Sequence, residues 1–306
     1  MWAGVPLNPA ETDMSRTVVA IFGPTASGKT AVAEAVADRL GTEVVSADAM
    51  QVYDGLPLLT NQPRRPTRLV AIWSLAHNGS VGEYQSLAHA AIDDLMATRS
   101  SAVVAGGTGL YFRAALADLA LPPAAEAAVR ARWEAEYDSD RDRTYAHLTA
   151  LDPSAAATVH ANDRRRVVRA LELAEVGASL APVSDRLWST LTRHPTVIVG
   201  LEVPPDELER RIVERIGAMF DAGVSDEVAA ALAQPLSRTA AKALGLHEIA
   251  SLPTDEARER VIVRTRQYAA YQRKWMRRIP GLVGVDARRP PDEVAIEILE
   301  MARSRQ

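Results

Sequence analysis

The stretch VVAIFGPTASGKTAVAEAVADRL, from Val18 to Leu40, decides the fold of this chain. It starts with an apolar run that predicts a buried parallel strand over 17–22. A glycine-rich turn comes next, and residues 29–40 then predict an amphipathic helix. A strand that enters a helix through a glycine-rich turn is typical of α/β proteins that bind phosphate.

The glycine-rich turn fits the P-loop pattern G-x-x-x-x-G-K-[ST] through Gly23, Gly28, Lys29 and Thr30. The backbone N–H groups of such a turn point inward, and the N-terminus of the following helix adds partial positive charge, so both attract an anion. Lys29 can neutralise phosphate charge. Nearly all of the 35 basic residues of the chain are arginine, so a lysine at this position indicates that a compact ammonium group is needed here. The Thr30 hydroxyl is placed to bind Mg²⁺.

A second apolar strand, expected over 42–48, ends at Asp48. Ligands of parallel sheets bind at the C-terminal ends of the strands, so Asp48 is the carboxylate expected at the phosphate site. From the residues alone, Asp48 is a candidate for holding Mg²⁺ through water, for acting as a general base, or for capping a turn. Residues 49–68, which follow it, are expected to form an ordered surface loop.

Farther from the P-loop, strands alternate with helices. We expect strands over 17–22, 42–48, 68–75, 101–107, 196–203 and, at an edge of the sheet, 281–287. We expect helices over 29–40, 81–99, 108–116, 204–223 and two later segments, the second at roughly 255–278. This order predicts a doubly wound α/β fold, that is, a P-loop NTPase-like core with a parallel sheet flanked by helices.

Residues 123–180 show only helical patterns, with Asp or Asn at the expected caps. We therefore divide the chain into three parts. They are a flexible N-terminal tail over 1–16, a core formed by 17–122 and 186–306, and an all-helical insertion over 123–185.

Composition excludes several classes of protein. The chain has 306 residues, of which 47% are hydrophobic and 24% charged, as in ordinary globular proteins. It has no cysteine, which excludes disulfides and thiolate zinc sites. No apolar run approaches a membrane span of about 20 residues, and the first residues lack a signal-peptide layout, so we expect a cytoplasmic protein with no membrane contact. A net charge of −4 argues against coating nucleic acid through bulk charge alone.

Several stretches together resemble the family of tRNA dimethylallyltransferases, also called tRNA isopentenyltransferases. They occur in the family's order and span nearly the whole chain: GPTASGKT, SADAMQVYDG, GGTGLYF, HANDRRRVVRALE, ERRIVERIGAMFDAGVSDEV, RTAAKALGLHEI and RTRQYAAYQRKWMRR. The resemblance implies transfer of a five-carbon allylic group from dimethylallyl diphosphate to the N6 amine of adenosine 37 in the anticodon stem-loop of tRNA. It further implies release of diphosphate, assistance by Mg²⁺ and a monomeric enzyme.

The resemblance also assigns roles to residues. It makes Asp48 the general base and places Thr108 near the donor oxygen and the adenine. Arg211 and Arg215 lie one turn apart on one helix face; we favour Arg215 as the catalytic arginine at the diphosphate and keep Arg211 as a further candidate for binding it. The diphosphate-binding set is then Gly23, Pro24, Thr25, Ala26, Ser27, Gly28, Lys29, Thr30 and Arg211. The tRNA-binding set is Asp48, Ala49, Met50, Gln51, Thr108, Arg130, Arg165, Arg166, Arg169, Lys242, Arg273 and Lys274.

Two basic clusters are candidates for gripping the RNA backbone. One lies over 164–169, and the other, over 261–280, is free of acidic residues and interleaved with Tyr268, Tyr271 and Trp275. Positive charge with stacking rings is typical of nucleic-acid binding. The alternative interpretation is a solvated arginine face whose rings pack into the core.

The chain departs from the family's usual pattern at a few places. Ala49 stands where the family has serine, residues 53–67 differ, RLVAIW replaces a histidine-rich segment, and Tyr271 replaces a basic residue. Competing functions are the same transfer to a free adenine nucleotide, an ATP-dependent small-molecule kinase, and an RNA-binding module without catalysis. The helical insertion and the basic cluster over 261–280 favour RNA as the substrate.

Overall fold

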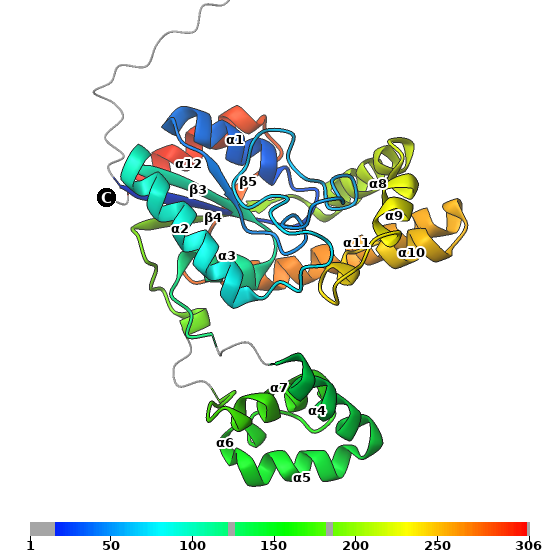
Figure 1. Ribbon diagram of the computed structural model, residues 1–306. Helices are drawn as coiled ribbons and strands as arrows, with labels where there is room; N and C mark the ends of the chain where they lie inside the picture. Colours follow the sequence, from blue (N-terminus) through cyan, green and yellow to red (C-terminus); the bar gives the residue numbers. More distant parts are fainter. Residues whose placement is uncertain (1–15, 122–125, 182–185, 305–306) are drawn as a thin grey trace, which may run out of the picture. The chain divides into compact units, whose positions relative to one another are not determined.

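The computed structural model describes residues 16–121, 126–181 and 186–304 (Figure 1). The chain forms two compact units, the first made of Met1–Asp118 and Trp188–Gln306 and the second of Leu119–Leu187. The expected N-terminal tail lies, apart from Arg16, outside the described residues.

The first unit is built on a parallel sheet of five strands in the order β2-β3-β1-β4-β5. The strands are β1 Thr17–Phe22, β2 Val44–Ser46, β3 Ser101–Gly106, β4 Thr196–Glu202 and β5 Val283–Asp286. Every residue of the central strand β1 is buried. The sequence predictions for β1, β3, β4 and the edge strand β5 are confirmed.

Besides this sheet, the described residues of the first unit form eight helices. They are α1 Lys29–Leu40, α2 Val81–Arg99, α3 Gly109–Leu116, α8 Pro205–Asp221, α9 Val224–Leu232, α10 Leu246–Ser251, α11 Thr254–Met276 and α12 Pro291–Arg303. Two short 3₁₀ turns, η2 Arg186–Trp188 and η3 Ala240–Lys242, accompany them. Figure 1 shows α1 and α12 packed together on one face, and α2 and α3 on the other. The prediction of a doubly wound α/β fold is confirmed, although helix α12 was not foreseen.

Two strand predictions need correction. Residues 68–75 form no strand, because Leu69 and Ala71 have φ values of 65° and 53°, in the left-handed region that an extended strand excludes. The isolated bridges Val45–Arg68 and Tyr53–Trp73, with backbone hydrogen bonds such as Ala71 N to Gln51 O, connect this segment to the rest of the unit. Strand β2 ends at Ser46, so Asp48 lies in the turn two residues beyond it.

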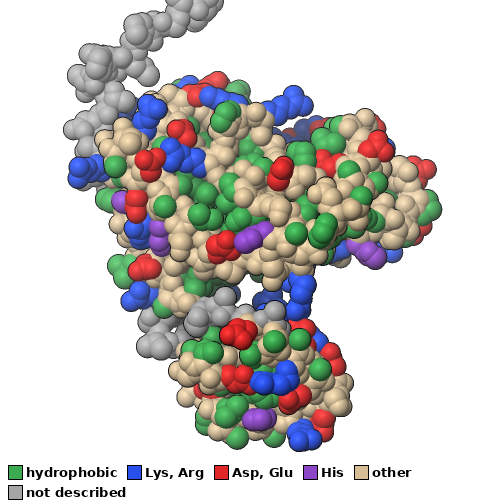
Figure 2. Space-filling view, viewed as in Figure 1, with side chains coloured by type: hydrophobic (Ala, Val, Ile, Leu, Met, Phe, Trp, Pro, Cys, Tyr) green, Lys and Arg blue, Asp and Glu red, His purple; other side chains and the backbone are tan. Residues whose placement is uncertain are grey.

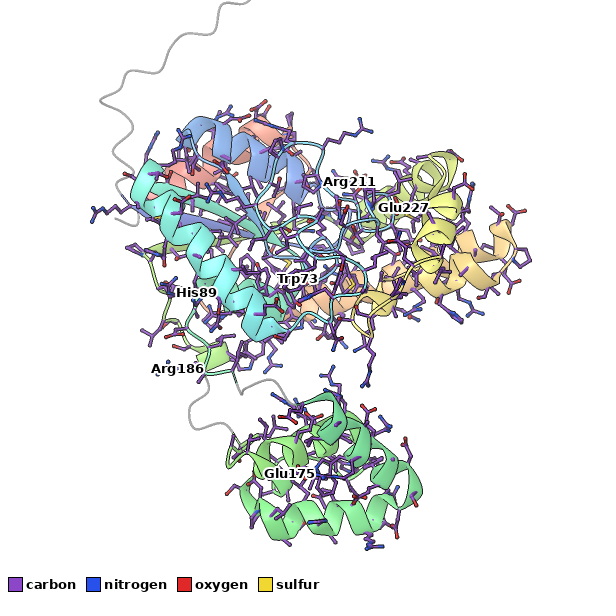
Figure 3. The ribbon with its side chains drawn as sticks, in the orientation of Figure 1. Trp73, His89, Glu175, Arg186, Arg211 and Glu227 are labelled. Carbon is purple, nitrogen blue, oxygen red and sulfur yellow. The ribbon has the colours of Figure 1, made fainter. Side chains whose placement is uncertain are left out.

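The segment after β2 is held in place by long-range contacts. The Glu227 carboxylate on α9 accepts hydrogen bonds from Leu58 N at 2.7 Å and Leu59 N at 2.8 Å. Trp73 packs against Tyr53, and a Cβ on Gly79 would lie 2.2 Å from the Trp73 ring. Figure 3 labels Trp73 and Glu227. The expectation that residues 49–68 form an ordered loop is confirmed.

The described residues of the second unit form helices joined by turns and loops, with no strand among them, as predicted. Its helices are α4 Ala127–Ser139, α5 Arg141–Leu151, α6 Pro153–Ala156 and α7 Arg164–Glu175. The side chains of Asp140, Asp152 and Asp163 cap α5, α6 and α7 by accepting hydrogen bonds from backbone N–H groups of the first turn. The unit has its own core, formed around Trp133, Tyr137, Leu148, Val167, Val168 and Leu171.

Candidate active site

Three loops meet at the C-terminal edge of the sheet because they follow the adjacent strands β2, β3 and β1. They are the turn after β2, the Gly106–Thr108 loop after β3 and the P-loop, residues 23–30, after β1. Strands β1 and β3 stay paired up to Phe22 and Gly106. A Cβ on Gly106 would lie 2.1 Å from Ala47 O, so only glycine allows the first two loops to approach this closely.

A pocket of about 880 Å³ opens between these loops and helices α8 and α11. It is lined by many of the residues predicted from the sequence: Thr25, Ala26, Gly28, Lys29, Thr30, Asp48, Ala49, Met50, Gln51, Thr108, Arg211, Arg215 and Lys242. Gly23 and Ser27 are buried in the loop itself. Pro24 and Arg273 line a separate cavity of about 750 Å³, beyond the ends of β4 and β5.

The P-loop has the backbone of an anion-binding turn. Ala26 and Gly28 have φ values of 62° and 88°, so two left-handed residues curl the loop ahead of helix α1. Lys29 Nζ donates a hydrogen bond to Pro24 O at 2.7 Å. Burial lowers the pKa of Lys29 to about 8, and the nearby Arg215 acts in the same direction, against the opposing effect of Asp48. An anion bound here would restore the charge that burial disfavours.

The two arginines of α8 that line the pocket have different partners. The Arg215 guanidinium donates to Thr25 Oγ1 of the P-loop, and burial lowers its pKa. Arg211, labelled in Figure 3, forms an ion pair with Glu207, its Nε lying 2.7 Å from Glu207 Oε1. Among the described residues, no carboxylate forms a salt bridge with Arg215. Its guanidinium is therefore the one directed at the P-loop and open to an anionic ligand.

Asp48 and Thr108 line the same pocket as these cations, and the charge of Asp48 acts to raise the pKa of both Lys29 and Arg215. Asp48 Oδ1 accepts a hydrogen bond from Met50 N at 2.9 Å, as expected of a turn cap. Thr108 Oγ1 accepts one from Ala49 N at 3.2 Å and lies 3.4 Å from Tyr268 OH. The cap uses one oxygen of Asp48, and its half-buried carboxylate still lines the pocket.

The predicted base-contacting amide of Gln51 already has protein partners. Gln51 Oε1 accepts a hydrogen bond from Ser46 Oγ at 2.9 Å, and its Nε2 donates to Asn61 O at 2.8 Å. To contact a base, the amide oxygen and nitrogen of Gln51 would have to share or give up these hydrogen bonds. The role of Gln51 stays a prediction.

Several of the arginines predicted to grip RNA are paired with acids. In the second unit, Arg130 pairs with Glu134 at 3.1 Å, Arg169 with Glu172 at 3.0 Å and the exposed Arg166 with Asp163 at 3.8 Å. Arg165 is exposed. The visible face of this unit shows basic and acidic side chains interspersed (Figure 2). On α11 of the first unit, Arg264 and Arg266 pair with acids, and Lys274 is exposed.

Gln272 is a site residue that sequence reasoning missed. The sequence places Gln272 only within a basic helix. In the structure, Gln272 is buried, lines the pocket and forms hydrogen bonds with two of the loops that surround the pocket. A signal was available, because the buried positions of α11 follow a helical repeat that includes it. They are Ala257, Val261, Thr265, Ala269 and Gln272.

A parallel sheet that carries a P-loop after its central strand and a pocket at the C-terminal strand ends defines a P-loop α/β protein with an anion-binding site. The family model described as IPP transferase matches residues 51–279, and the model described as isopentenyl transferase matches residues 16–66. The chain therefore belongs to the IPP transferase family, a family of prenyltransferase enzymes. This confirms the resemblance found in the sequence motifs.

Relatives and solved structures agree with this assignment. The chain is 38% identical over 283 residues to the tRNA dimethylallyltransferase of Thermobifida fusca, and the aligned part covers 86% of this chain and 88% of the relative. It is 39% identical over 285 residues to that of Salinispora arenicola, with coverages of 89% and 82%. The tRNA isopentenylpyrophosphate transferase from Bacillus halodurans superposes with a TM-score of 0.67 at 29% identity, over 94% of this chain and 95% of that one. A eukaryotic dimethylallyltransferase acting on tRNA shares the fold, with a TM-score of 0.77 at 22% identity, over 95% of this chain and 80% of that one.

Among the described residues, no helix is both long and apolar enough to cross a bilayer.

Proposed function

We propose that this enzyme transfers the dimethylallyl group of dimethylallyl diphosphate to the N6 amine of adenosine 37 in the anticodon stem-loop of tRNA and releases diphosphate. The observation that carries the proposal is one pocket lined by the P-loop, by the cations Lys29 and Arg215, and by the carboxylate of Asp48. The names of the relatives support tRNA as the acceptor.

The P-loop side of the pocket suits a leaving diphosphate. As the bond between the allylic carbon and its oxygen breaks, negative charge grows on the diphosphate oxygens. Backbone N–H groups of the loop, Lys29 and Arg215 are fixed in place before that charge develops, so they stabilise it without reorganising. The remaining P-loop residues Gly23, Pro24, Ala26, Ser27 and Gly28 shape the loop.

The opposite side of the pocket suits the acceptor. The N6 amine forms the new bond to the allylic carbon and must lose one proton. We assign that proton to Asp48, whose half-buried carboxylate lines the pocket. The Thr108 hydroxyl lines the same pocket and is assigned to orient the amine.

The residues present fit an Mg²⁺ ion. The Thr30 hydroxyl lines the pocket that would hold the diphosphate. Proteins usually bind Mg²⁺ through one or two side chains together with substrate phosphates. The described residues contain no cluster of three or more His, Cys, Asp or Glu side chains able to hold a metal, so the substrate oxygens would supply most of the ligands. When bound, Mg²⁺ neutralises charge on the leaving diphosphate.

The acceptor base has to leave its stack to reach this pocket. We propose that Ala49, Met50, Gln51 and Lys242, which line the pocket, contact the extruded nucleotide. The cations proposed to contact the RNA backbone are Arg273 and Lys274 on α11 and Arg130, Arg165, Arg166 and Arg169 in the second unit.

A label-transfer assay tests the proposed function. The protein is incubated with Mg²⁺ and radiolabelled dimethylallyl diphosphate, and unmodified tRNA, AMP or ATP is offered as the acceptor. The expected result is label in tRNA alone. Label in AMP would instead identify a free-nucleotide prenyltransferase, and consumption of ATP without transfer of label would identify a kinase.

The lowered pKa of Lys29 gives a pH prediction. Bound diphosphate holds Lys29 protonated, whereas the unliganded lysine loses its proton as the pH rises through about 8, so binding then requires uptake of a proton. From pH 7 to pH 9, the affinity for inorganic diphosphate with Mg²⁺ should therefore fall about 10-fold more in the wild type than in Lys29→Arg, which stays charged. Titration calorimetry measures both slopes, and equal slopes would contradict the role of Lys29.

A further inference from the structure

The amide of Gln272 connects two loops of the active site. Its side chain is 2% exposed. Gln272 Oε1 accepts a hydrogen bond from Thr25 N of the P-loop at 2.7 Å, and Gln272 Nε2 donates one to Gly107 O at 2.9 Å. Both polar ends of one buried amide are thus used, each on a different loop.

The sheet itself does not hold these two loops together beyond the strand ends. The pairing of β1 with β3 ends at Phe22 and Gly106, and each loop then leaves the sheet. Beyond the strand ends, the two hydrogen bonds of the Gln272 side chain connect the loops in place of backbone pairing. The fit is tight, since a Cβ on Gly107 would lie 2.2 Å from Gln272 Nε2 and 3.0 Å from Gly23 O.

Neighbouring contacts converge on the same two loops. The hydroxyl of Thr25 accepts a hydrogen bond from Arg215, so this residue is held by α8 through its side chain and by α11 through its backbone. One turn before Gln272, Tyr268 OH lies 3.4 Å from Thr108 Oγ1. The same stretch of α11 thus touches the diphosphate side of the pocket and its acceptor side.

We propose that Gln272 is a positioning residue that sets the spacing between the P-loop and the Gly107–Thr108 segment. The inference rests on the proposed function, in which the P-loop holds the diphosphate and Thr108 faces the acceptor amine. Reacting atoms must lie within about 3–3.5 Å of one another, and a misplacement of about 1 Å lowers a rate roughly 10²-fold. Gln272 acts on the reaction only through the two loops that it joins.

The variant Gln272→Met tests this role, because methionine has a similar length and suits a helix but has no amide. With both substrates saturating, kcat for tRNA prenylation should fall roughly 10²-fold. Affinity for inorganic diphosphate with Mg²⁺, measured by calorimetry, should change far less, because the P-loop residues and Arg215 that hold the head group are all retained. The matched control is Gln267→Met on the exposed side of the same helix, which should keep the wild-type kcat.

A second variant keeps the test valid if Gln272→Met does not fold. In Gly107→Ala, the added Cβ would lie 2.2 Å from Gln272 Nε2 and so displaces the amide from the second loop, and a similar loss of kcat is expected. A folded Gln272→Met enzyme with wild-type kcat would overturn the proposal. So would equal losses of kcat, diphosphate affinity and thermal stability, which would indicate a structural role only. A wild-type protein that transfers no label to tRNA would overturn the proposed function and this inference with it.

Discussion

The variant Asp48→Asn is expected to lower kcat by about 10²–10⁴-fold, the usual contribution of a general base. Asparagine has nearly the same shape and keeps an oxygen that can accept the hydrogen bond from Met50 N, so the turn after β2 should stay intact. The amide does not take up a proton, so the N6 amine loses its proton acceptor. Single-turnover measurements of label transfer to tRNA, with the donor saturating, give the rate directly.

The matched control for this variant is Asp54→Asn. Asp54 lies on the same segment, is exposed, and caps a turn by accepting a hydrogen bond from Gly55 N at 2.8 Å, but it does not line the pocket. Its replacement should leave kcat unchanged. If Asp48→Asn instead loses donor affinity in proportion to its loss of rate, Asp48 holds the metal ion and is not the base.

The second large effect is expected at Arg215. Replacement by methionine removes the guanidinium that donates to Thr25 Oγ1 and faces the P-loop. Loss of one preorganised donor to a developing oxyanion lowers rates by about 10²–10³-fold, and we expect a loss of this size in kcat/KM for the donor. Steady-state kinetics at saturating tRNA measures it.

Arg211→Met is the control for Arg215→Met, because the two arginines lie one turn apart on α8 and both line the pocket. Arg211 is already paired with Glu207, so its loss should have a much smaller effect on kcat/KM. Equal losses in the two variants would show that both arginines act on the diphosphate. A larger loss in Arg211→Met would reverse the assignment.

The sequence-based predictions succeeded where the structural signal is local. The P-loop pattern, the apolar runs of β1 and β3 and the Asp caps of α5, α6 and α7 each depend on residues within a few positions of one another. They failed at residues 68–75, whose apolar composition suits a strand but whose backbone turns left-handed at Leu69 and Ala71. That segment is ordered by distant contacts instead.

The parts of the candidate site that sequence reasoning could not supply depend on long-range partners. The hydrogen bond between Thr25 and Gln272 joins residues 247 positions apart, and no local pattern marks it. The pairing of Arg211 with Glu207 is an i,i+4 contact within α8 and could have been read from the sequence. The contact of Arg215 with Thr25, by contrast, joins residues 190 positions apart. Likewise, the second partner of Arg130, Glu172 at 3.6 Å, lies on another helix of the second unit.

The most direct test of the central claim is a crystal structure with Mg²⁺ and a non-hydrolysable analogue of dimethylallyl diphosphate. The expected result is a diphosphate head group within hydrogen-bond distance of Lys29 Nζ and the Arg215 guanidinium, with the allylic carbon directed toward Asp48. A head group bound elsewhere, for example in the cavity beside Arg273 and Arg277, would contradict it.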